Sequence, residues 1–229
     1  MFYSGSYMNT RNYVISCPHC GTLKMVVCPT NDWIETDYIL WSDGYLESKQ
    51  WKGPAYTQKC NSCGKFFTLP ARYKYEIKEV SCEDTGFLDY RTLKSAIIQL
   101  SGDEIAEARA RLEAWWAYNI LSRSGVDIPK EETEFNTQNM QWLLRHHSEH
   151  TTRFSHLVFE LNRLLGNKSQ CEKMVEDLTF EQYLANRQAR MQEKGIHSNL
   201  DEKCLREMYD SEIEELKSAI SMPLIPYKK

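Results

Sequence analysis

Two short cysteine motifs carry the clearest chemical signal in the sequence. Cys17 and Cys20 belong to a Cys-Pro-His-Cys-Gly segment, and Cys60 and Cys63 belong to a Cys-Asn-Ser-Cys-Gly segment. A two-residue spacer lets both thiolates of a motif point at one ion, and the glycine that follows supplies the unusual backbone angle of such a turn. Four thiolates are soft ligands that favour tetrahedral zinc with no open coordination position. We therefore expect these four cysteines to bind one structural Zn²⁺ ion.

The two motifs resemble the knuckles of the zinc-ribbon superfamily, in which two β-hairpins clamp one zinc ion. The resemblance covers about residues 13–80 and assigns the ligand role to the four cysteines of the motifs. A spacer of 39 residues separates the motifs, whereas about 15–20 residues are common. The extra length contains a predicted hairpin over Trp33–Trp51. The layout, with Trp-Ser-Asp-Gly at 41–44, also resembles uncharacterised bacterial proteins that join such a ribbon to a helical region.

We expect the zinc ion to stabilise the fold rather than to catalyse a reaction. A domain of about 70–80 residues built from short strands has little core, and structural zinc supplies an apparent ~10–16 kcal/mol of binding free energy. A catalytic ion would need a water molecule in place of one thiolate. Three neighbours leave alternatives open: His19 is a turn residue or a ligand, and Cys28 and Cys82 are small buried residues or substitute ligands.

The composition of the 229-residue chain changes near residue 80. The part before it holds 14 of the 27 aromatic residues and a net charge of +2, whereas the rest carries a net charge of −6. Six of the eight cysteines fall within residues 17–82. These shifts predict a zinc-ribbon-like β domain over residues 1–82, an α-helical domain over residues 88–221, and an irregular tail over residues 222–229.

The hydrophobic pattern indicates strands before residue 80 and helices after residue 90. Ser42, Asp43 and Gly44 predict a hairpin turn, and Gly125, Gly166 and Gly195 mark helix ends. The fold class is therefore α+β: a small antiparallel β domain followed by an all-α domain of helical hairpins. Strands are predicted at 23–28, 34–41, 45–51, 64–69 and 72–80, and helices at 90–100, 103–124, 137–165 (with a break allowed near 148–151), 169–178, 180–194 and 199–220.

Capping boxes predict where four of the helices begin. In each, a Ser or Thr precedes an acidic or amide residue by three positions, so that the two side chains can satisfy free backbone N–H groups reciprocally. The four pairs are Ser101/Glu104, Ser169/Glu172, Thr179/Gln182 and Ser198/Asp201.

Three further clusters have a structural interpretation and a functional one. His146–His150 is a solvated or interface-facing helix surface, or, with Glu149, a second metal site. Trp115 and Trp116 pack in the helical core and against the zinc domain, or form a ligand platform. Leu161–Cys171 resembles the junction of an irregular tetratricopeptide-like hairpin, although no 34-residue period repeats.

The motifs that are present favour binding over catalysis. The chain has no P-loop, no dinucleotide-binding glycine motif, no nucleophile elbow and no kinase signature. We expect a non-catalytic zinc-binding adaptor that binds another protein through both domains; a small-molecule substrate does not fit this interpretation. The alternative is nucleic-acid binding through the basic, aromatic-rich ribbon. The candidate contact residues for either partner are Lys52, Lys59, Lys65, Trp41 and Trp51.

The hydropathy pattern bears on location. A mean hydropathy of −0.58, a polar N-terminus and the lack of a long apolar run argue against a membrane span. Clustered cysteines act as metal ligands rather than disulfides in a reducing compartment. We therefore expect a cytoplasmic protein.

Overall fold

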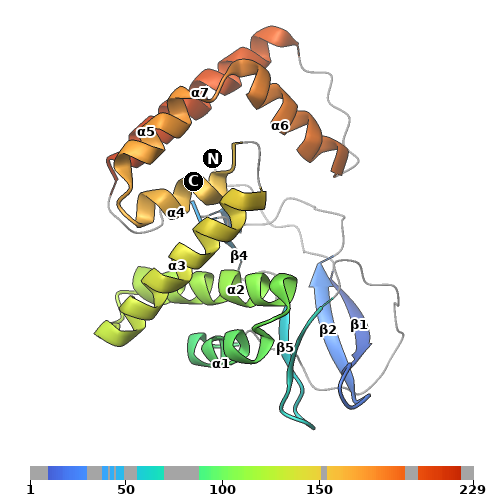
Figure 1. The fold of residues 1–229 in the computed structure, drawn as a ribbon. Helices are drawn as coiled ribbons and strands as arrows, with labels where there is room; N and C mark the ends of the chain where they lie inside the picture. The colour runs from blue at the N-terminus through green and yellow to red at the C-terminus, as the bar shows by residue number, and fades with distance from the viewer. Residues whose placement is uncertain are drawn as a thin grey trace. The chain divides into compact units, whose positions relative to one another are not determined.

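The structure of the chain is a computed structural model that describes residues 10–29, 38–40, 42–43, 45–48, 56–69, 88–150, 154–193 and 201–222. The chain divides into two compact units, Met1–Ile128 with Lys228–Lys229 and Pro129–Tyr227. Within the described ranges, the first unit holds six strands and two helices and the second holds five helices (Figure 1). The predicted α+β fold class is therefore confirmed, with an N-terminal β part and a helical C-terminal part.

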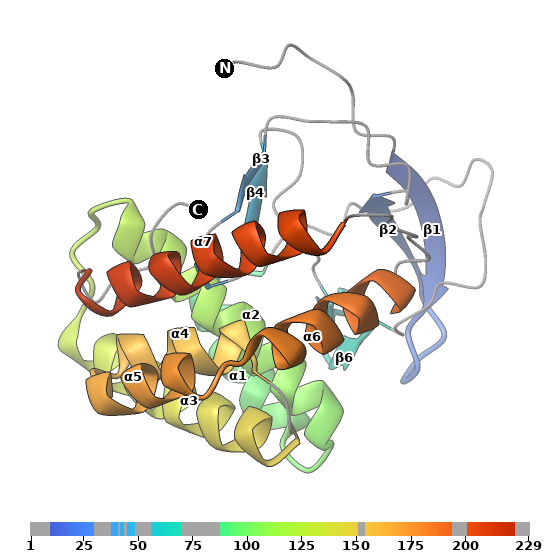
Figure 2. The same ribbon diagram turned by 90° about the horizontal axis from the view of Figure 1, so that it is seen from above.

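The described strands form three antiparallel hairpins rather than one sheet. Each hairpin pairs strands that follow one another in the chain, and the loops of the first and third hairpins hold the two cysteine motifs. Figure 2 shows the strands of the middle hairpin side by side. The strands are β1 (Thr10–Ser16) with β2 (Leu23–Pro29), β3 (Tyr38–Leu40) with β4 (Leu46–Ser48), and β5 (Thr57–Lys59) with β6 (Phe66–Thr68).

Four of the predicted strands match β2, β3, β4 and β6, and parts of the predicted ranges 34–41 and 45–51 lie outside the described residues. Strands β1 and β5 are not among the predicted ones. The three residues of β5 are too few to show an alternation, and β1 mixes polar and apolar residues along its length. The predicted strand at 72–80 lies outside the described residues.

Helices α1 (Tyr90–Leu100) and α2 (Glu104–Arg123) pack against each other and against the third hairpin. Leu93 and Ile97 of α1 and Ala110 and Ala114 of α2 are buried. The small alanine side chains let the two helices approach closely. This helix pair matches the predicted ranges 90–100 and 103–124 within a residue.

The two compact units do not coincide with the predicted division at residues 82–88. Because α1 and α2 pack with β5 and β6, they belong to the same unit as the strands, and the division falls between Ile128 and Pro129. Short hairpins bury little apolar surface on their own. The helix pair supplies contact surface for the third hairpin, since α1 contacts β6 and α2 contacts both β5 and β6. The charge and aromatic content of the sequence do not show that the hairpins depend on these two helices.

The second unit contains helices α3 to α7. The predicted helix at 137–165 is two helices, since α3 ends at His150 and α4 begins at His156. Helix α3 also begins earlier than predicted, because its first turns are polar and lack an apolar period. The bounds are α3 (Lys130–His150), α4 (His156–Leu164), α5 (Lys168–Glu176), α6 (Phe180–Glu193) and α7 (Glu202–Ile220).

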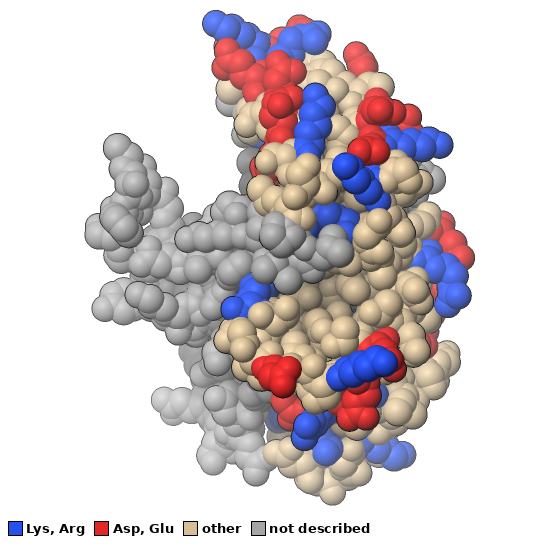
Figure 3. Space-filling view, turned by 90° about the vertical axis from the view of Figure 1, so that its left-hand side faces the viewer, with Lys and Arg blue, Asp and Glu red and all other residues tan. Residues whose placement is uncertain are grey.

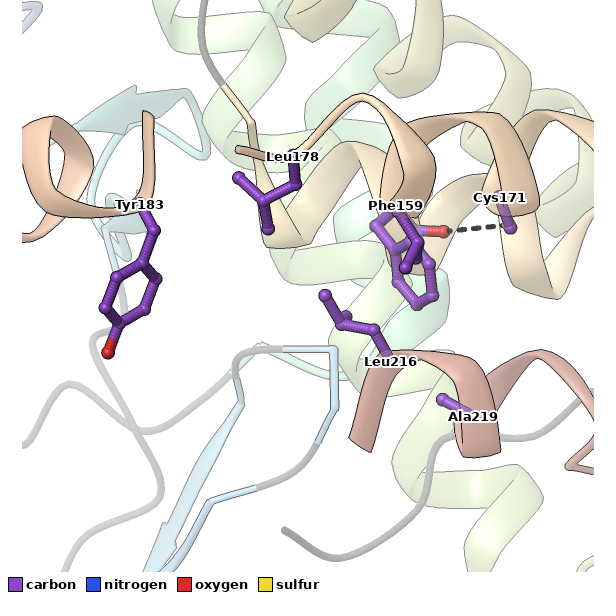
Figure 4. Packing of buried hydrophobic residues seen from close by; sticks show 7 residues of the cluster. Phe159, Cys171, Leu178, Tyr183, Leu216 and Ala219 are labelled. Carbon is purple, nitrogen blue, oxygen red and sulfur yellow. Dashed lines mark hydrogen bonds between the residues drawn. The ribbon is translucent and has the colours of Figure 1, made fainter. Parts of the chain in front are cut away.

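The core of the second unit contains residues of α4, α5, α6 and α7, with α6 contributing Tyr183 (Figure 4). Phe159 of α4, Cys171 of α5 and Leu216 and Ala219 of α7 are nearly inaccessible to solvent, and Leu178 covers them. The Cys171 thiol donates a hydrogen bond to the carbonyl oxygen of Phe159 at 3.7 Å, and burial raises the pKa of Cys171 to about 11. This cysteine is a small core residue rather than a reactive thiol.

The predicted capping boxes have mixed outcomes. The pair Thr179 and Gln182 is confirmed, because each side chain accepts a hydrogen bond from the backbone N–H of the other, at 3.3 and 3.2 Å. The predictions at Ser101 and Ser169 are wrong. Asp103 caps α2 instead, and α5 begins without a side-chain cap. Asp201 caps α7, while Ser198 lies outside the described residues.

Among the helices in the described ranges, none is both long enough and apolar enough to cross a lipid bilayer.

Candidate metal centre

The two cysteine motifs adopt the same backbone turn. In the first, the N–H of Cys17 donates to the carbonyl of Thr22 and the N–H of Gly21 donates to the carbonyl of Cys17, both at 2.9 Å. The second repeats this pattern between Cys60, Lys65 and Gly64, at 2.9 and 2.8 Å. The two glycines have φ angles of +76° and +71°, which residues with a Cβ rarely adopt. The predicted role of both glycines is confirmed.

The four thiols of the motifs converge on one point from two hairpins. All four Sγ atoms lie within 4.8 Å of one another. The Sγ atoms of Cys17 and Cys63 are 3.8 Å apart, and those of Cys20 and Cys60 are 3.5 Å apart. A tetrahedral zinc site with bonds of about 2.3 Å separates its sulfurs by about 3.8 Å, whereas a disulfide requires about 2.05 Å. The sulfur spacing therefore fits a shared metal ion and not a pair of disulfides.

The pKa values of Cys20 and Cys63 shift in opposite directions. Hydrogen bonds from the side chain and backbone of Thr22 lower the pKa of Cys20 to about 6. At Cys63 the backbone N–H of Lys65 lowers the pKa, but desolvation and the three neighbouring thiols outweigh it and raise the pKa to about 11. Four thiolates at this spacing repel one another, and a divalent cation compensates that repulsion. The donor set is therefore suited to a metal ion.

The hydrophobic core beside the thiols is small. Cys17 and Cys60 pack with Phe67 and Leu69, and Ile15 is partly buried against them. Among the described residues, polar contacts also join the first hairpin to the third. They run from His19 Nε2, which lies 3.2 Å from the carbonyl oxygen of Phe66, and from Lys24 Nζ, which donates to the carbonyl oxygen of Lys59 at 2.8 Å.

His19 therefore has a partner on the opposite hairpin. Its Nε2 contacts a carbonyl oxygen, and the group of close ligand atoms found in the described ranges comprises the four cysteines alone. The interpretation of His19 as a turn residue is the one that this contact supports. Cys28 lies on β2, and Cys82 falls outside the described residues.

Helix α2 holds the end of the third hairpin that is opposite the cysteines (Figure 1). The Glu113 carboxylate accepts hydrogen bonds from the backbone N–H groups of Tyr56 and Thr57, the latter at 3.0 Å. Arg109 Nη1 donates to the carbonyl oxygen of Leu69 at 2.6 Å. We call these contacts of Glu113 and Arg109 with the hairpin the clasp. The clasp was not predicted from the sequence, since a Glu and an Arg one turn apart on a helix are typical of a solvated face.

Helix α2 also binds the turn of the middle hairpin. The Asp43 carboxylate accepts hydrogen bonds from Asn119 Nδ2 at 2.8 Å and from Arg123 Nη1 at 3.0 Å, and the backbone N–H of Tyr45 bonds to its other oxygen. The indole N–H of Trp116 donates to the carbonyl oxygen of Asp43 at 3.0 Å. The predicted turn at Ser42–Asp43 is present, and its aspartate is a buried anchor for the helix.

The tryptophan pair packs as predicted. Trp115 is fully buried, while Trp116 is 9% exposed and tilts against the Tyr45 ring at 6.1 Å between centroids. One tryptophan therefore fills the core of the unit and the other covers the middle hairpin.

The histidine cluster on α3 forms ring contacts. The ring of His146 stacks on Trp142 at 4.9 Å and meets the ring of His147 edge-on at 5.2 Å. It is not part of the metal-binding group identified in the described residues, and the side chain of His150 lies outside them.

The structure describes two of the five candidate contact residues. Lys59 and Lys65 are exposed beside the second cysteine motif, and Lys59 Nζ lies 5.5 Å from the centre of the Phe66 ring. Lys52, Trp41 and Trp51 lie outside the described residues.

Comparison with known proteins identifies no relative: no family model, no curated protein and no solved structure matches the chain.

Proposed function

We propose that the chain binds one zinc ion through Cys17, Cys20, Cys60 and Cys63, and that the ion is structural. The observation that carries this proposal is the sulfur spacing, which fits a tetrahedral four-thiolate site. Such a site leaves no position for water or substrate, so the ion holds the two hairpins together. Elemental analysis of the purified chain tests the assignment. One zinc per chain supports it, and stoichiometric iron or no metal contradicts it.

The protein acts as a non-catalytic adaptor that binds another protein. Three of the four buried acidic residues in the described ranges support this, because their side chains are used inside the fold. Glu113 accepts backbone hydrogen bonds, Asp43 pairs with Arg123, and Glu160 forms a bidentate pair with Arg163 at 2.8 Å. Buried acids that hold the fold together are not available for acid or base catalysis.

Exposed apolar residues support a protein partner for the first unit. Ile98 on α1 is 74% exposed and Ile105 on α2 is 67% exposed, and they flank the same turn. On the face drawn in Figure 3, positive and negative side chains are interspersed among the coloured residues, without a large patch of one sign. Such a surface suits a protein partner better than a polyanion.

Affinity capture with the full chain as bait tests the adaptor proposal. A partner that the wild-type chain retains, and that Ile98→Lys with Ile105→Lys loses, supports it. Capture that the double variant leaves unchanged contradicts the role of this surface. An exposed substitution on the second unit, Met208→Lys, is the matched control, since Met208 is 36% exposed.

Nucleic-acid binding is the second candidate, and one feature favours it. Segments 10–29 and 56–69 contain no acidic residue, and they carry Arg11, Lys24, Lys59 and Lys65. However, a zinc ion with four thiolates has a net charge of about −2, which offsets part of this positive charge. A gel-shift assay at low salt separates the candidates: binding that weakens with added salt and is lost in Lys59→Glu/Lys65→Glu favours nucleic acid over the adaptor.

A further inference from the structure

The third hairpin is held at both of its ends. Cys60 and Cys63 lie in the loop at one end, and Tyr56 and Leu69 lie at the other, where the N–H of Leu69 donates to the carbonyl of Tyr56 at 2.7 Å. The thiols of the loop reach the first hairpin, as described above. The opposite end reaches helix α2 through side chains of that helix. One short β-ribbon therefore connects the metal centre to the helix.

The contact between the ribbon and the helix is buried. Thr57 is fully inaccessible to solvent, Leu69 is 1% exposed and Glu113 is 3% exposed. The guanidinium carbon of Arg109 lies 5.6 Å from the centre of the Tyr56 ring, so Arg109 contacts the residue before β5 as well as the Leu69 carbonyl oxygen after β6. A variant that leaves these buried backbone N–H donors without an acceptor is penalised, because the donors have lost their contact with water.

The ribbon cannot hold its own shape. Strands β5 and β6 have three residues each, and an isolated two-stranded hairpin is marginally stable at best. A metal ion that fixes one end reduces the conformational entropy that docking on α2 must overcome. By linkage, docking on α2 must strengthen metal binding by the same factor.

We propose that Glu113 is a positioning residue that couples the metal centre to helix α2, so that ion binding and docking of the α1–α2 pair on the third hairpin support each other. This inference rests on the proposed metal site and extends it, because the stability of the helix pair then depends on whether the ion is bound. Loss of the ion loosens a helix that contributes no ligand, and loss of the clasp weakens ion binding.

Hydrogen exchange on the full-length chain tests the first half of the proposal. Zinc content is measured first, and the exchange of backbone amides is then compared before and after removal of the ion with a chelator. We expect the amides of α1 and α2 to exchange faster by about tenfold or more without the ion. Helices α5 to α7 serve as the internal control, because they belong to the other compact unit, and their exchange should not change.

Variants of Glu113 test the second half. Zinc affinity is measured by competition with a chromophoric chelator for Glu113→Leu, for Glu113→Gln and for Glu104→Gln, an exposed glutamate of the same helix. Changes at residues that support metal ligands typically cost about 10–100-fold in metal affinity. We expect a loss near the lower end of that range for the leucine variant. Both glutamine variants should stay close to wild type, because a glutamine side chain at position 113 retains an oxygen that accepts N–H bonds.

The outcomes separate the coupling from the metal site. If the wild type binds zinc but the amides of α2 exchange at the same rate after the zinc is removed, the coupling is overturned and the metal site remains. A zinc affinity of Glu113→Leu equal to that of the wild type also overturns the coupling and leaves the metal site in place. A chain that holds no metal overturns both. If Glu113→Leu does not fold, the exchange experiment on the wild type still decides the matter.

Discussion

The Glu113 carboxylate accepts a hydrogen bond from the backbone N–H of Thr57 at 3.0 Å, across 56 positions of the chain. This contact joins a helix to the strand that leads into the second cysteine motif. Because Cys60 directly follows that strand, the contact connects helix α2 to the hairpin that carries two of the four thiols. Asp43 has a similar role at the middle hairpin, where it joins the turn to the same helix.

The stability of the first unit should depend on pH through Glu113. Burial raises the pKa of this carboxyl from 4.5 to about 8, although hydrogen bonds from Thr57 and Tyr56 and the charge of Arg109 oppose the shift. The folded chain then binds a proton that the unfolded chain has released. The contribution of Glu113 to the free energy of unfolding is therefore highest below about pH 4.5. It declines as pH rises toward 8, by up to about 1.4 kcal/mol per pH unit.

Glu113→Gln isolates this effect, because glutamine does not titrate. Denaturant unfolding of the zinc-loaded wild type and variant from about pH 6 to pH 9 should give a difference that moves in favour of the variant as pH rises. The thiol contributions cancel in this difference. If the difference in free energy of unfolding stayed constant from pH 6 to pH 9, Glu113 would already be ionised at about pH 6.

Removal of the Asp43 carboxylate should destabilise the first unit strongly. Asp43→Ala leaves the Arg123 guanidinium, whose side chain is 9% exposed, without its buried counter-ion. Breaking such a pair costs about 3–5 kcal/mol. Chemical denaturation measures the loss, and Asp127→Ala, a change at an exposed aspartate of the same unit, is the control. A loss below about 1 kcal/mol, the range of an exposed pair, would mean that Arg123 finds another partner.

The capping box of α6 should matter more than the serine near the start of α5. The Thr179 hydroxyl accepts the N–H of Gln182 at 3.3 Å, whereas α5 has no side-chain cap. Thr179→Ala should therefore cost about 1 kcal/mol, and Ser169→Ala should cost only a small fraction of that. Equal losses in thermal or denaturant unfolding would argue against the assigned caps.

The features that could be predicted from the sequence depend on neighbouring residues. The knuckle turns at Cys17 and Cys60 need only a two-residue spacer and a glycine, and most helix ranges follow from a helical apolar period. The turn at Ser42–Asp43 was likewise predicted from local residue types.

The features that could not be predicted depend on distant partners. The burial of Glu113 and Asp43 arises from backbone and side-chain groups far away in the sequence, and an isolated Glu or Asp is typical of a solvated surface. The placement of α1 and α2 with the strands has the same origin, because composition does not record which apolar surface covers a weak hairpin. Ser101 also fits a capping box, but Asp103 lies closer to the first turn of α2 and provides the cap.

The central claim is that four cysteines of this chain hold one zinc ion. X-ray absorption at the zinc edge of the purified full-length protein tests it most directly. The predicted result is four sulfur neighbours at about 2.3 Å and no nitrogen or oxygen ligand. A zinc ion with nitrogen or oxygen among its ligands, or a protein that contains no zinc, would contradict the claim.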